Sequence, residues 1–510
     1  MPRSSVPARQ VVTTRWEEKW KGEEVRSRFV ARDYKWREPD RTDLFAATPS
    51  DVGLALLLSI ASALRLCVQT LDLVTAFIHA DIQEPVFVEP PVGYEDSQNV
   101  WRLKKAMNGV RSAPLAFQDF LVEVLSNRVK MLRSLADPMV FYHADKPLYV
   151  DIHVDDPIAF GSETDLAAFY KELEVHVCVK VEPVVQVGGC FRYLGRSYTR
   201  TEKGFIRRPG ATYIQDTLEL AGMPDCSSAV TPGSSTPSAA ELQGKDELLT
   251  GQDLWLYPQV VGRLQFLAGD RADIQFACKE CARDLAAPTA SSLLKLKRLL
   301  RYLAGTQRMV QKIELDEIPR YLDCFADSNW ANCVATRKST SGLHLRFGNV
   351  LIKAFSRTQS TIALSSGEAE FIALSSAAIE GIWTKNFLKE LGYDIQVRVW
   401  SDSKAAIGMA SRIGPGRVKH LDLKSMFVQK LIKEKVVSIH KVLTDDNYSD
   451  LGTKYLPLPR HQLLLRMSGM YEEDDDKSIG QVCCVTDMVD TALVVLDRYP
   501  MLTVCFFILI

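Results

Sequence analysis

The stretch LYVDIHVDD, residues 148–156, alternates apolar and polar side chains, which predicts a half-buried strand that ends in two acids. In a continuing strand Asp155 and Asp156 would point to opposite faces, so they can share a site only if a tight turn begins there. Pro157 is compatible with such a turn. The stretch therefore predicts a β-hairpin with two carboxylates at its tip, although an isolated Asp-Asp pair is more often an ordinary acidic turn. On this pattern Asp151 faces solvent.

A further acid precedes this hairpin in the sequence. Residues 51–66 are apolar at helical spacing and predict a buried helix, and residues 67–71 predict a strand that delivers Asp72. Several carboxylates that converge on one point can hold hard divalent cations at neutral pH, and two such ions about 4 Å apart serve phosphoryl transfer. Asp72 and the hairpin acids therefore predict a metal site at strand ends.

After residue 321 the pattern changes to a small mixed α/β sheet. Strands are expected at 321–326, 343–346, 350–355 and 395–400, with a helix that starts near Ser365. Four acids lie at the ends of these elements or on the border of the helix: Asp327, Glu370, Asp402 and Asp450. Each alone is typical of a surface residue, but together they suit metal binding.

Composition limits the classes that remain. The 510 residues allow three or four domains, and the net charge of -1 gives no bulk support for nucleic-acid binding. The 11 cysteines lack a disulfide pattern and fit a reducing compartment, and the Cys278/Cys281 pair is interpreted as packing. Neither a signal peptide nor a membrane anchor is expected, because residues 501–510 form too short an apolar run.

Two local basic features have alternative interpretations. Residues 28–32 form a strand-like stretch whose guanidinium groups suit a triphosphate or a nucleic-acid backbone, or are simply solvated. Lys295, Arg298 and Arg301 share one face of a helical stretch. That face fits a phosphate-tracking surface or an ordinary solvated surface.

Short motifs in a fixed order carry a family resemblance. They are RFVAR at 28–32, LDLVTAF at 71–77, VFVEPPVGY at 86–94, LKKAMNGVRSAP at 103–114, VDD at 154–156, YLG at 193–195, RADI at 271–274, RYLAGT at 301–306, KSTSG at 338–342, SSGEAEF at 365–371, KH at 419–420 and DLGTK at 450–454. Their order and spacing resemble the reverse transcriptase and RNase H region of a copia-type LTR retrotransposon Pol polyprotein. Patterns of a protease, an integrase or a zinc knuckle are missing, which indicates a piece of a longer polyprotein.

The resemblance implies an α+β multidomain fold: a right-hand polymerase with fingers, palm and connection, followed by an RNase H-like α/β domain. The expected domains are reverse transcriptase fingers and palm at 1–230, a linker at 231–252, a helical thumb or connection at 253–318, an RNase H-like domain at 319–458 and a poorly ordered tail at 459–510.

The implied activity is that of an RNA-directed DNA polymerase with RNase H activity, using two Mg²⁺ ions per site, with Mn²⁺ as an alternative. The implied metal ligands and catalytic residues are Asp72, Asp155 and Asp156 in the palm, and Asp327, Glu370, Asp402 and Asp450 in the nuclease domain. The implied substrate contacts are Arg28 and Arg32 to the triphosphate, Phe77 beside the sugar 2′-carbon, and Asn108, Gly109 and Pro114 beside the nucleotide and template.

The implied partners are an RNA template, a DNA primer, an RNA/DNA hybrid and deoxynucleoside triphosphates, without a membrane, in a cytoplasmic virus-like particle or the nucleus. Some positions depart from the family pattern. His153 and Asn108 stand where Tyr is usual, Pro157 follows the acidic pair, and Asn329 replaces an acid. These departures keep open the alternative of a catalytically decayed, nucleic-acid-binding retroelement remnant.

Overall fold

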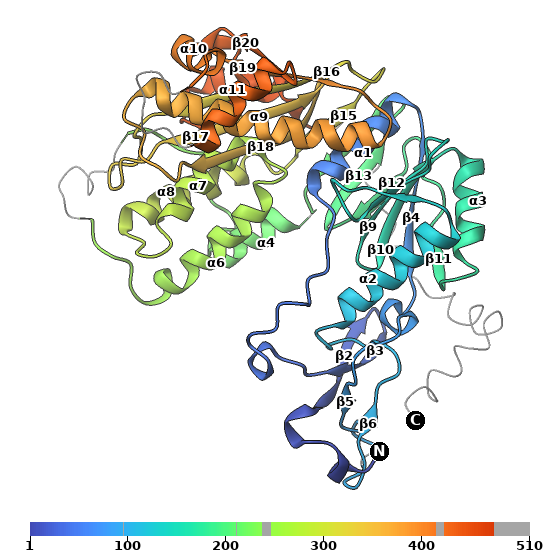
Figure 1. Cartoon of the computed structure of the whole chain (residues 1–510). Helices are drawn as coiled ribbons and strands as arrows, with labels where there is room; N and C mark the ends of the chain where they lie inside the picture. The colour runs from blue at the N-terminus through green and yellow to red at the C-terminus, as the bar shows by residue number, and fades with distance from the viewer. Residues whose placement is uncertain (95, 211, 237–245, 415–422, 474–510) are drawn as a thin grey trace. The chain divides into compact units, whose positions relative to one another are not determined.

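The computed structural model describes residues 1–473, except residues 95, 211, 237–245 and 415–422. The described chain forms two compact units (Figure 1). The first contains Met1–Ser50 and Cys67–Val184, and the second contains Asp51–Leu66 and the chain from Val185 onward. The expected division at residue 230 is therefore not where the compact units divide. The reason is strand pairing, since strands that follow Val185 share a sheet with strands far downstream.

The first unit is built on a six-stranded sheet in the order β11-β4-β10-β9-β8-β7, in which all neighbours are antiparallel. Its strands are β4 (Cys67–Leu73), β7 (Leu132–Arg133), β8 (Val140–Tyr142), β9 (Tyr149–His153), β10 (Asp156–Gly161) and β11 (Val179–Val181). Apolar side chains of α2 (Ala113–Glu123) and α3 (Glu163–Leu173) join Val150, Ile152 and Ala159 of the sheet in one core. The strand that carries Asp72 thus lies beside the hairpin that carries Asp155 and Asp156.

Strand β9 corrects one sequence prediction. The alternation in residues 148–156 predicted a strand with one solvent face, but Tyr149, Val150, Asp151 and Ile152 are all buried. The strand lies in the interior of the sheet and is covered on both faces, so its polar positions do not mark a solvent-exposed face. The predicted hairpin itself is present, because β9 and β10 pair from Asp156↔His153 to Phe160↔Tyr149.

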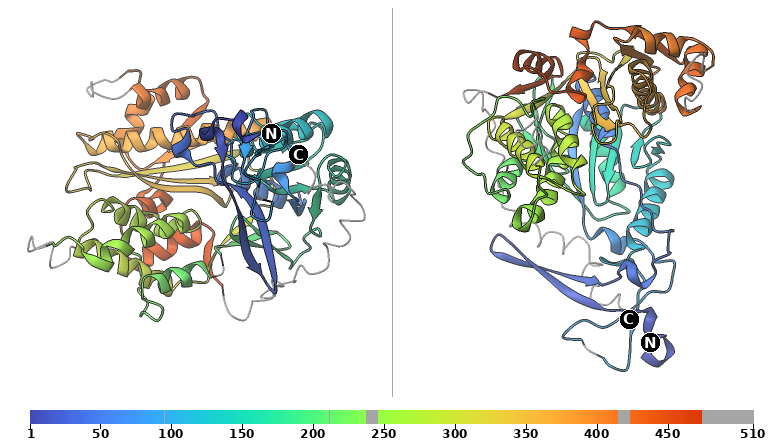
Figure 2. Two further views of the ribbon diagram at one scale, coloured as in Figure 1. Left: turned by 90° about the horizontal axis from the view of Figure 1, so that it is seen from below. Right: turned by 90° about the vertical axis from the view of Figure 1, so that its left-hand side faces the viewer.

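Two smaller elements complete the first unit. Strands β2 (Thr14–Lys21) and β3 (Glu24–Ala31) form a long two-stranded ribbon (Figure 2). Strands β1 (Val11–Val12), β5 (Phe87–Val88) and β6 (Trp101–Arg102) form a small sheet. The end of β3 is tied to the loop before α2, since the Ala31 amide donates to the Asn108 carbonyl at 2.9 Å.

The second unit contains helix α1 (Asp51–Ala63), which is buried from Val52 to Ser62 as the sequence predicted. Its first sheet has the order β12-β13-β14-β15-β21. The strands are β12 (Cys190–Tyr193), β13 (Arg196–Arg200), β14 (Gly204–Arg208), β15 (Met309–Glu314) and β21 (Met470–Glu472). The expectation of a poorly ordered tail from residue 459 is wrong for residues 459–473. Their segment includes helix α12 (Leu458–Met467) and strand β21, which pairs with β15.

A helical group fills the middle of the second unit. It consists of α4 (Tyr213–Leu220), α6 (Gly251–Leu267), α7 (Gln275–Arg283) and α8 (Ala290–Ala304), which share one apolar core. Cys278 and Cys281 lie within that core, and burial raises the pKa of the Cys281 thiol to about 12. The interpretation of this pair as packing is confirmed. In the part of the chain that the structure describes, no helix has the length and apolar character needed to cross a bilayer.

The basic face of α8 has a structural role that the sequence did not predict. Arg298 donates to the Thr231 hydroxyl at 2.9 Å, and Arg301 donates to the Ser227 carbonyl at 2.7 Å. On the other side of the expected linker, the Asp246 carboxylate accepts the Ser291 amide at 2.9 Å. These contacts fasten both described ends of the 231–252 segment to α8, so Arg298 and Arg301 do not form a free phosphate-tracking stripe.

The motifs RADI and RYLAGT meet in one buried network. Arg271 and Asp273 form an ion pair of 2.7 Å with both side chains inaccessible to solvent. The Tyr302 hydroxyl donates to Asp273 at 2.7 Å, and Arg271 donates to the Thr306 carbonyl at 2.9 Å. A buried charge left without its partner typically costs about 3–5 kcal/mol. The residues of these two motifs therefore stabilise the fold of the second unit, and none of them is one of the four acids expected to bind metal.

The last part of the second unit is a mixed sheet in the order β18-β17-β16-β19-β20. Its strands are β16 (Tyr321–Asn329), β17 (Thr340–Phe347), β18 (Val350–Thr358), β19 (Gln396–Ser401) and β20 (Val437–Lys441). β16 is antiparallel to β17 and parallel to β19. The long helix α9 (Ser366–Glu390) packs against these strands, and α10 (Lys404–Ser411) and α11 (Leu423–Lys433) follow. The α/β pattern predicted after residue 321 is confirmed.

Candidate functional site

Three of the expected nuclease acids meet at one edge of the mixed sheet. Asp327 lies in β16, Glu370 in α9 and Asp402 directly after β19. Because β16 and β19 run parallel, with Phe325 opposite Trp400, their following residues emerge at the same edge. One carboxylate oxygen from each acid lies within 4.8 Å of the others.

Local sequence explains how α9 and α10 approach this edge. Ser365 caps α9 by accepting the Glu368 amide at 3.2 Å, and Ser403 caps α10 by accepting the Ala406 amide at 3.2 Å. Gly367 allows the close approach of the two helices, since a Cβ there would lie 2.9 Å from the Ala405 Cβ. The serines and the glycine thus fix where Glu370 and Asp402 enter the site.

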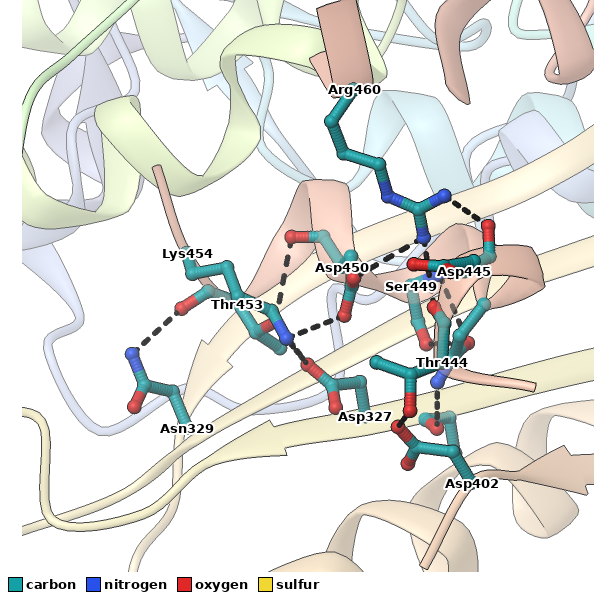
Figure 3. A network of polar contacts seen from close by, with 12 residues as sticks. Asp327, Asn329, Asp402, Thr444, Asp445, Ser449, Asp450, Thr453, Lys454 and Arg460 are labelled. Atoms are coloured by element: carbon teal, nitrogen blue, oxygen red, sulfur yellow. Dashed lines mark hydrogen bonds and ion pairs between the residues drawn. The ribbon is translucent and has the colours of Figure 1, made fainter. Parts of the chain in front are cut away.

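The fourth expected acid, Asp450, lies in the short 3-10 helix Tyr448–Gly452 and is buried beside the cluster. It is held by two cations: Lys454 Nζ lies 2.6 Å from Asp450 Oδ1, and Arg460 Nη2 lies 3.4 Å from Oδ2 (Figure 3). Lys454 Nζ also lies 3.5 Å from Asp327 Oδ2, which accepts a hydrogen bond from the Thr453 hydroxyl. Asp450 is therefore connected to Asp327 through Lys454 and Thr453.

Burial and like charge dominate the electrostatics of this acidic cluster. Burial, followed by the charges of Asp327 and Asp402, raises the pKa of Glu370. Burial also raises the pKa of Asp327, although Lys454 opposes that shift. Burial alone would lower the pKa of Lys454, but Asp327 and Asp450 outweigh it and raise that pKa. The cluster concentrates negative charge that one lysine only partly offsets.

The donor set fits a divalent cation. Oxygen is the ligand atom that Mg²⁺ and Mn²⁺ prefer, and all the donors here are carboxylate oxygens. Glu370 Oε2 is buried and has no hydrogen-bond partner among the described residues. A buried carboxylate oxygen without a partner is costly, and a metal ion at this edge would satisfy it.

Sequence reasoning missed several residues that organise this site. Thr444 donates to Asp402 Oδ2 at 2.9 Å, and Asn329 donates through Nδ2 to the Thr453 carbonyl at 3.1 Å. An acid at position 329 could not make that bond, so the Asn329 departure has a structural use. Lys454 follows Asp450 at i+4, a spacing that could have indicated an ion pair. The expected Lys419-His420 motif lies outside the described residues.

The expected polymerase acids also lie near one another, but more loosely. β4 and β10 are paired with Thr70 opposite Ile158, and the Leu73 amide donates to the Asp155 carbonyl at 3.0 Å. This register brings Asp72 beside the hairpin tip. Partial burial, and then the charges of Asp155 and Asp72, raise the pKa of Asp156. Across the described chain, however, these three acids are not among the groups whose ligand atoms come within 4.8 Å.

The hairpin tip has an unusual backbone. Val154 has φ of +58°, which is strained for a β-branched residue. Pairing of β10 with β4 is recorded from Gly161 to Ile158 and not at Pro157, which has no N–H to donate to the neighbouring strand. Pro157 therefore shortens the ladder next to the acids without preventing the hairpin.

Most of the expected substrate residues share one pocket of the first unit. A pocket of about 320 Å³ is lined by Arg28, Arg32, Asn108 and Gly109, together with Arg15, Glu17, Val30, Ala31, Asp33 and Tyr34. Arg28 and Arg32 both line this pocket together with Arg15, and guanidinium groups suit the binding of an anion. Gly109 is required at its position, because it has φ of +86° and a Cβ would lie 2.0 Å from the Ala31 carbonyl oxygen.

The remaining two expected substrate residues do not line this pocket. Phe77 is half-buried and packs edge-on against Phe117, with ring centroids 5.9 Å apart. Pro114 lies in the first turn of α2. Phe77 thus contributes to the core of the first unit at least as much as it contributes to any substrate surface.

Comparison with known proteins agrees with this geometry. Residues 2–235 match the family model described as reverse transcriptase (RNA-dependent DNA polymerase). Among solved structures, the foamy viral protease-reverse transcriptase in complex with RNA/DNA hybrid aligns with a TM-score of 0.51 and 13% identity, covering 85% of this chain and 50% of that one. The chain therefore has the fold of a reverse transcriptase, and the expected right-hand polymerase followed by an RNase H-like domain is confirmed.

Curated relatives extend the match over most of the chain. It is 26% identical over 472 residues to the retrovirus-related Pol polyprotein from transposon TNT 1-94 of Nicotiana tabacum, covering 88% of this chain and 34% of that protein. It is also 26% identical over 445 residues to the corresponding polyprotein from transposon RE1 of Arabidopsis thaliana, covering 85% and 29%. The chain is thus similar over most of its length to the Pol polyproteins of copia-type retrotransposons, and it spans about a third of the length of these relatives.

Proposed function

We propose that this chain is an RNA-directed DNA polymerase with an accompanying ribonuclease H activity. The observation that carries the proposal is the convergence of acids from distant segments at two places, one in each compact unit. The match of residues 2–235 to the reverse transcriptase family supports the polymerase activity. The oxygen cluster of Asp327, Glu370 and Asp402 supports the nuclease activity.

In the proposed polymerase reaction, Asp72, Asp155 and Asp156 hold two Mg²⁺ or Mn²⁺ ions. Bound divalent ions activate the attacking hydroxyl or water and stabilise charge on the leaving oxygen. Arg28 and Arg32 bind the triphosphate of the incoming deoxynucleotide in their shared pocket. Asn108, Gly109 and Pro114 border the nucleotide and template, and Phe77 limits the space beside the sugar.

In the proposed nuclease reaction, Asp327, Glu370, Asp402 and Asp450 would hold divalent ions, which would activate water for attack on the RNA strand of a hybrid. Selection of RNA depends on the 2′-hydroxyl and on hybrid shape. The partners of the whole molecule are an RNA template, a DNA primer, their hybrid and deoxynucleoside triphosphates. We also propose action in a cytoplasmic particle or the nucleus, which the free cysteines among the described residues support.

Primer extension on an RNA template with Mg²⁺ tests the polymerase proposal. Wild-type protein should extend the primer, and Asp155→Asn should reduce extension by about 100-fold or more, because a proposed ligand of the ions that stabilise transition-state charge is lost. The matched control is Asp145→Asn, which changes an exposed turn residue of the same sheet and should leave extension unchanged. Equal extension by wild type and Asp155→Asn would remove the polymerase claim.

A decayed remnant is the second candidate function. The strained Val154 turn and the wider spacing of the polymerase acids favour it for the first unit. It predicts nucleic-acid binding without primer extension.

A third possibility is that the nuclease alone is active. Cleavage of an RNA/DNA hybrid, lost in Asp402→Asn but kept in the exposed control Asp394→Asn, would support it if primer extension is absent.

A further inference from the structure

Lys454 occupies the space between two of the expected metal ligands. Its Nζ lies 2.6 Å from Asp450 Oδ1 and 3.5 Å from Asp327 Oδ2 (Figure 3). The side chains of Asp327 and Asp450 are 4% and 5% exposed, so each carboxylate needs a nearby positive charge. Lys454 supplies that charge to both of them.

The contacts of Asp450 separate it from the other three acids. Lys454 faces its Oδ1, and Arg460 faces its Oδ2 at 3.4 Å. The close oxygen cluster contains Asp327, Glu370 and Asp402 but not Asp450. The four-acid set is thus divided into a three-oxygen group that only Lys454 approaches, through Asp327, and Asp450, which faces both Lys454 and Arg460.

We propose that Lys454 is a built-in counter-cation that takes the place of one of the two divalent ions while nucleic acid is absent. The inference rests on the proposed nuclease function. It means that the free protein binds one divalent ion at Asp327, Glu370 and Asp402. A second ion binds through Asp450 only after the Lys454 ammonium has moved away. Lys454 is a positioning residue, since it acts through Asp327 and Asp450.

The surroundings of Lys454 allow this movement. Its side chain is 39% exposed, so its end can turn toward solvent without disturbing the core. The backbone before it is fixed, because Thr453 is fully buried, donates to Asp327 and accepts from Asn329 at 3.1 Å. A phosphate of a bound hybrid offers the ammonium an alternative anion. Nucleic-acid binding and uptake of the second ion are therefore coupled.

Counting bound Mn²⁺ on the full chain by electron paramagnetic resonance tests the proposal. All samples carry Asp72→Asn and Asp155→Asn, so that ions bound at the polymerase acids are suppressed. This background should bind one Mn²⁺ that the further substitution Asp402→Asn removes. Adding Lys454→Met should allow a second Mn²⁺ to bind, because a competing cation is removed. The affinity for this second ion should be at least about tenfold higher than the affinity of the background for a second ion.

Control variants separate charge at this position from charge in general. Lys430→Met removes an exposed lysine of α11 and should leave one bound ion, and Lys454→Arg, which keeps the positive charge, should do the same. Lys454→Gln provides a second neutral variant in case Lys454→Met does not fold, as judged by circular dichroism.

The outcomes distinguish the two hypotheses. If the background binds no Mn²⁺ that Asp402→Asn removes, the proposed nuclease function fails. If the background binds one such ion and both neutral variants of Lys454 bind no more, the inference about Lys454 is wrong and the nuclease function stands.

Discussion

The two sets of acids are assembled in different ways. Asp327 is 3% exposed and lies inside a strand, and its oxygen is within 4.8 Å of oxygens from Glu370 and Asp402. Asp72 and Asp155, by contrast, lie exposed at the end of a strand and at a hairpin tip, without a comparably close grouping. Strands and a helix hold the acids of the first set close together and bury them, which raises the pKa of Asp327 and of Glu370, whereas Asp72 and Asp155 remain exposed.

A sequence motif can therefore predict which residues lie near one another, but not the distances between their carboxylate oxygens. The nuclease cluster is preorganised by a parallel strand pair and two capped helices, so electrostatic repulsion is already present without metal. The polymerase acids are positioned by a short turn with a strained residue, so their carboxylates must move closer together when ions and substrate bind.

The largest expected effect is a reciprocal loss of activity. Glu370→Gln should reduce cleavage of an RNA/DNA hybrid by about 100-fold or more while primer extension persists, and Asp72→Asn should do the opposite. The two assays on the same preparations provide the measurement. If either variant lost both activities while remaining folded, the two sites would not be independent.

The next effect is stabilisation by metal. At an Mg²⁺ concentration about 100 times the dissociation constant, binding to the folded state adds about 2.7 kcal/mol. Hydrogen exchange of β16 amides, followed by mass spectrometry, should slow on addition of Mg²⁺ in wild type and in Asp72→Asn. The same amides in Glu370→Gln should respond much less. An equal response in Glu370→Gln would mean that the ion does not bind at this cluster.

Without metal, the same substitution should be stabilising. In EDTA, Glu370→Gln removes the cost of burying an ionisable carboxyl group beside Asp327 and Asp402 and should raise the free energy of unfolding by about 1–2 kcal/mol. Asp72→Asn removes an exposed charge and should change it by less than about 0.5 kcal/mol. Urea unfolding of both variants in EDTA compares their free energies of unfolding directly. Destabilisation by Glu370→Gln would show that the Glu370 carboxyl group does not destabilise the metal-free protein.

The loss of stability as pH rises should also differ between wild type and Glu370→Gln. Burial raises the pKa values of Glu370 and Asp327 in the folded state, so the folded protein holds these protons more tightly than the unfolded chain. Their contribution is full below the ordinary carboxyl range and is lost as pH rises above it, at up to about 1.4 kcal/mol per pH unit for each group. Urea unfolding in EDTA at pH values above the ordinary carboxyl range should show that the free energy of unfolding falls less steeply with pH for Glu370→Gln than for wild type.

The smallest effect concerns the polymerase hairpin. Val154 has φ of +58°, a conformation that costs a β-branched residue more than it costs glycine. Val154→Gly should therefore stabilise the protein by up to about 1 kcal/mol, after the extra unfolded-state entropy of glycine is counted. Urea unfolding measures the change. A loss of stability would show that Val154 makes contacts worth more than the strain.

Much of this architecture could be predicted from residue patterns. Apolar spacing located α1, β4 and the strands around Asp327, and a serine cap located the start of α9. The resemblance grouped Asp327, Glu370, Asp402 and Asp450, and the oxygens of the first three lie within 4.8 Å of one another. It also gave Arg28, Arg32, Asn108 and Gly109 as substrate contacts, and these four line one pocket. The helices and strands depend on local periodicity and capping, whereas the acids and the pocket residues come from distant segments, so only the family resemblance could group them.

Other features depend on long-range contacts that no local pattern contains. Asp151 alternates like a solvent-facing residue, yet it lies in a central strand and is fully buried. Arg298 and Arg301 form a regular basic stripe, but they bind carbonyl and hydroxyl groups of a segment about 70 residues away. The pairing of β15 with β21 shows that residues after 459 belong to the folded unit.

Mn²⁺ anomalous diffraction from crystals of the full chain, grown with an RNA/DNA hybrid, tests the central claim most directly. We expect anomalous peaks coordinated by Asp327, Glu370 and Asp402, and separate peaks beside Asp72 and Asp155. Crystals that contain Mn²⁺ elsewhere but show no peak at either acidic set would contradict it.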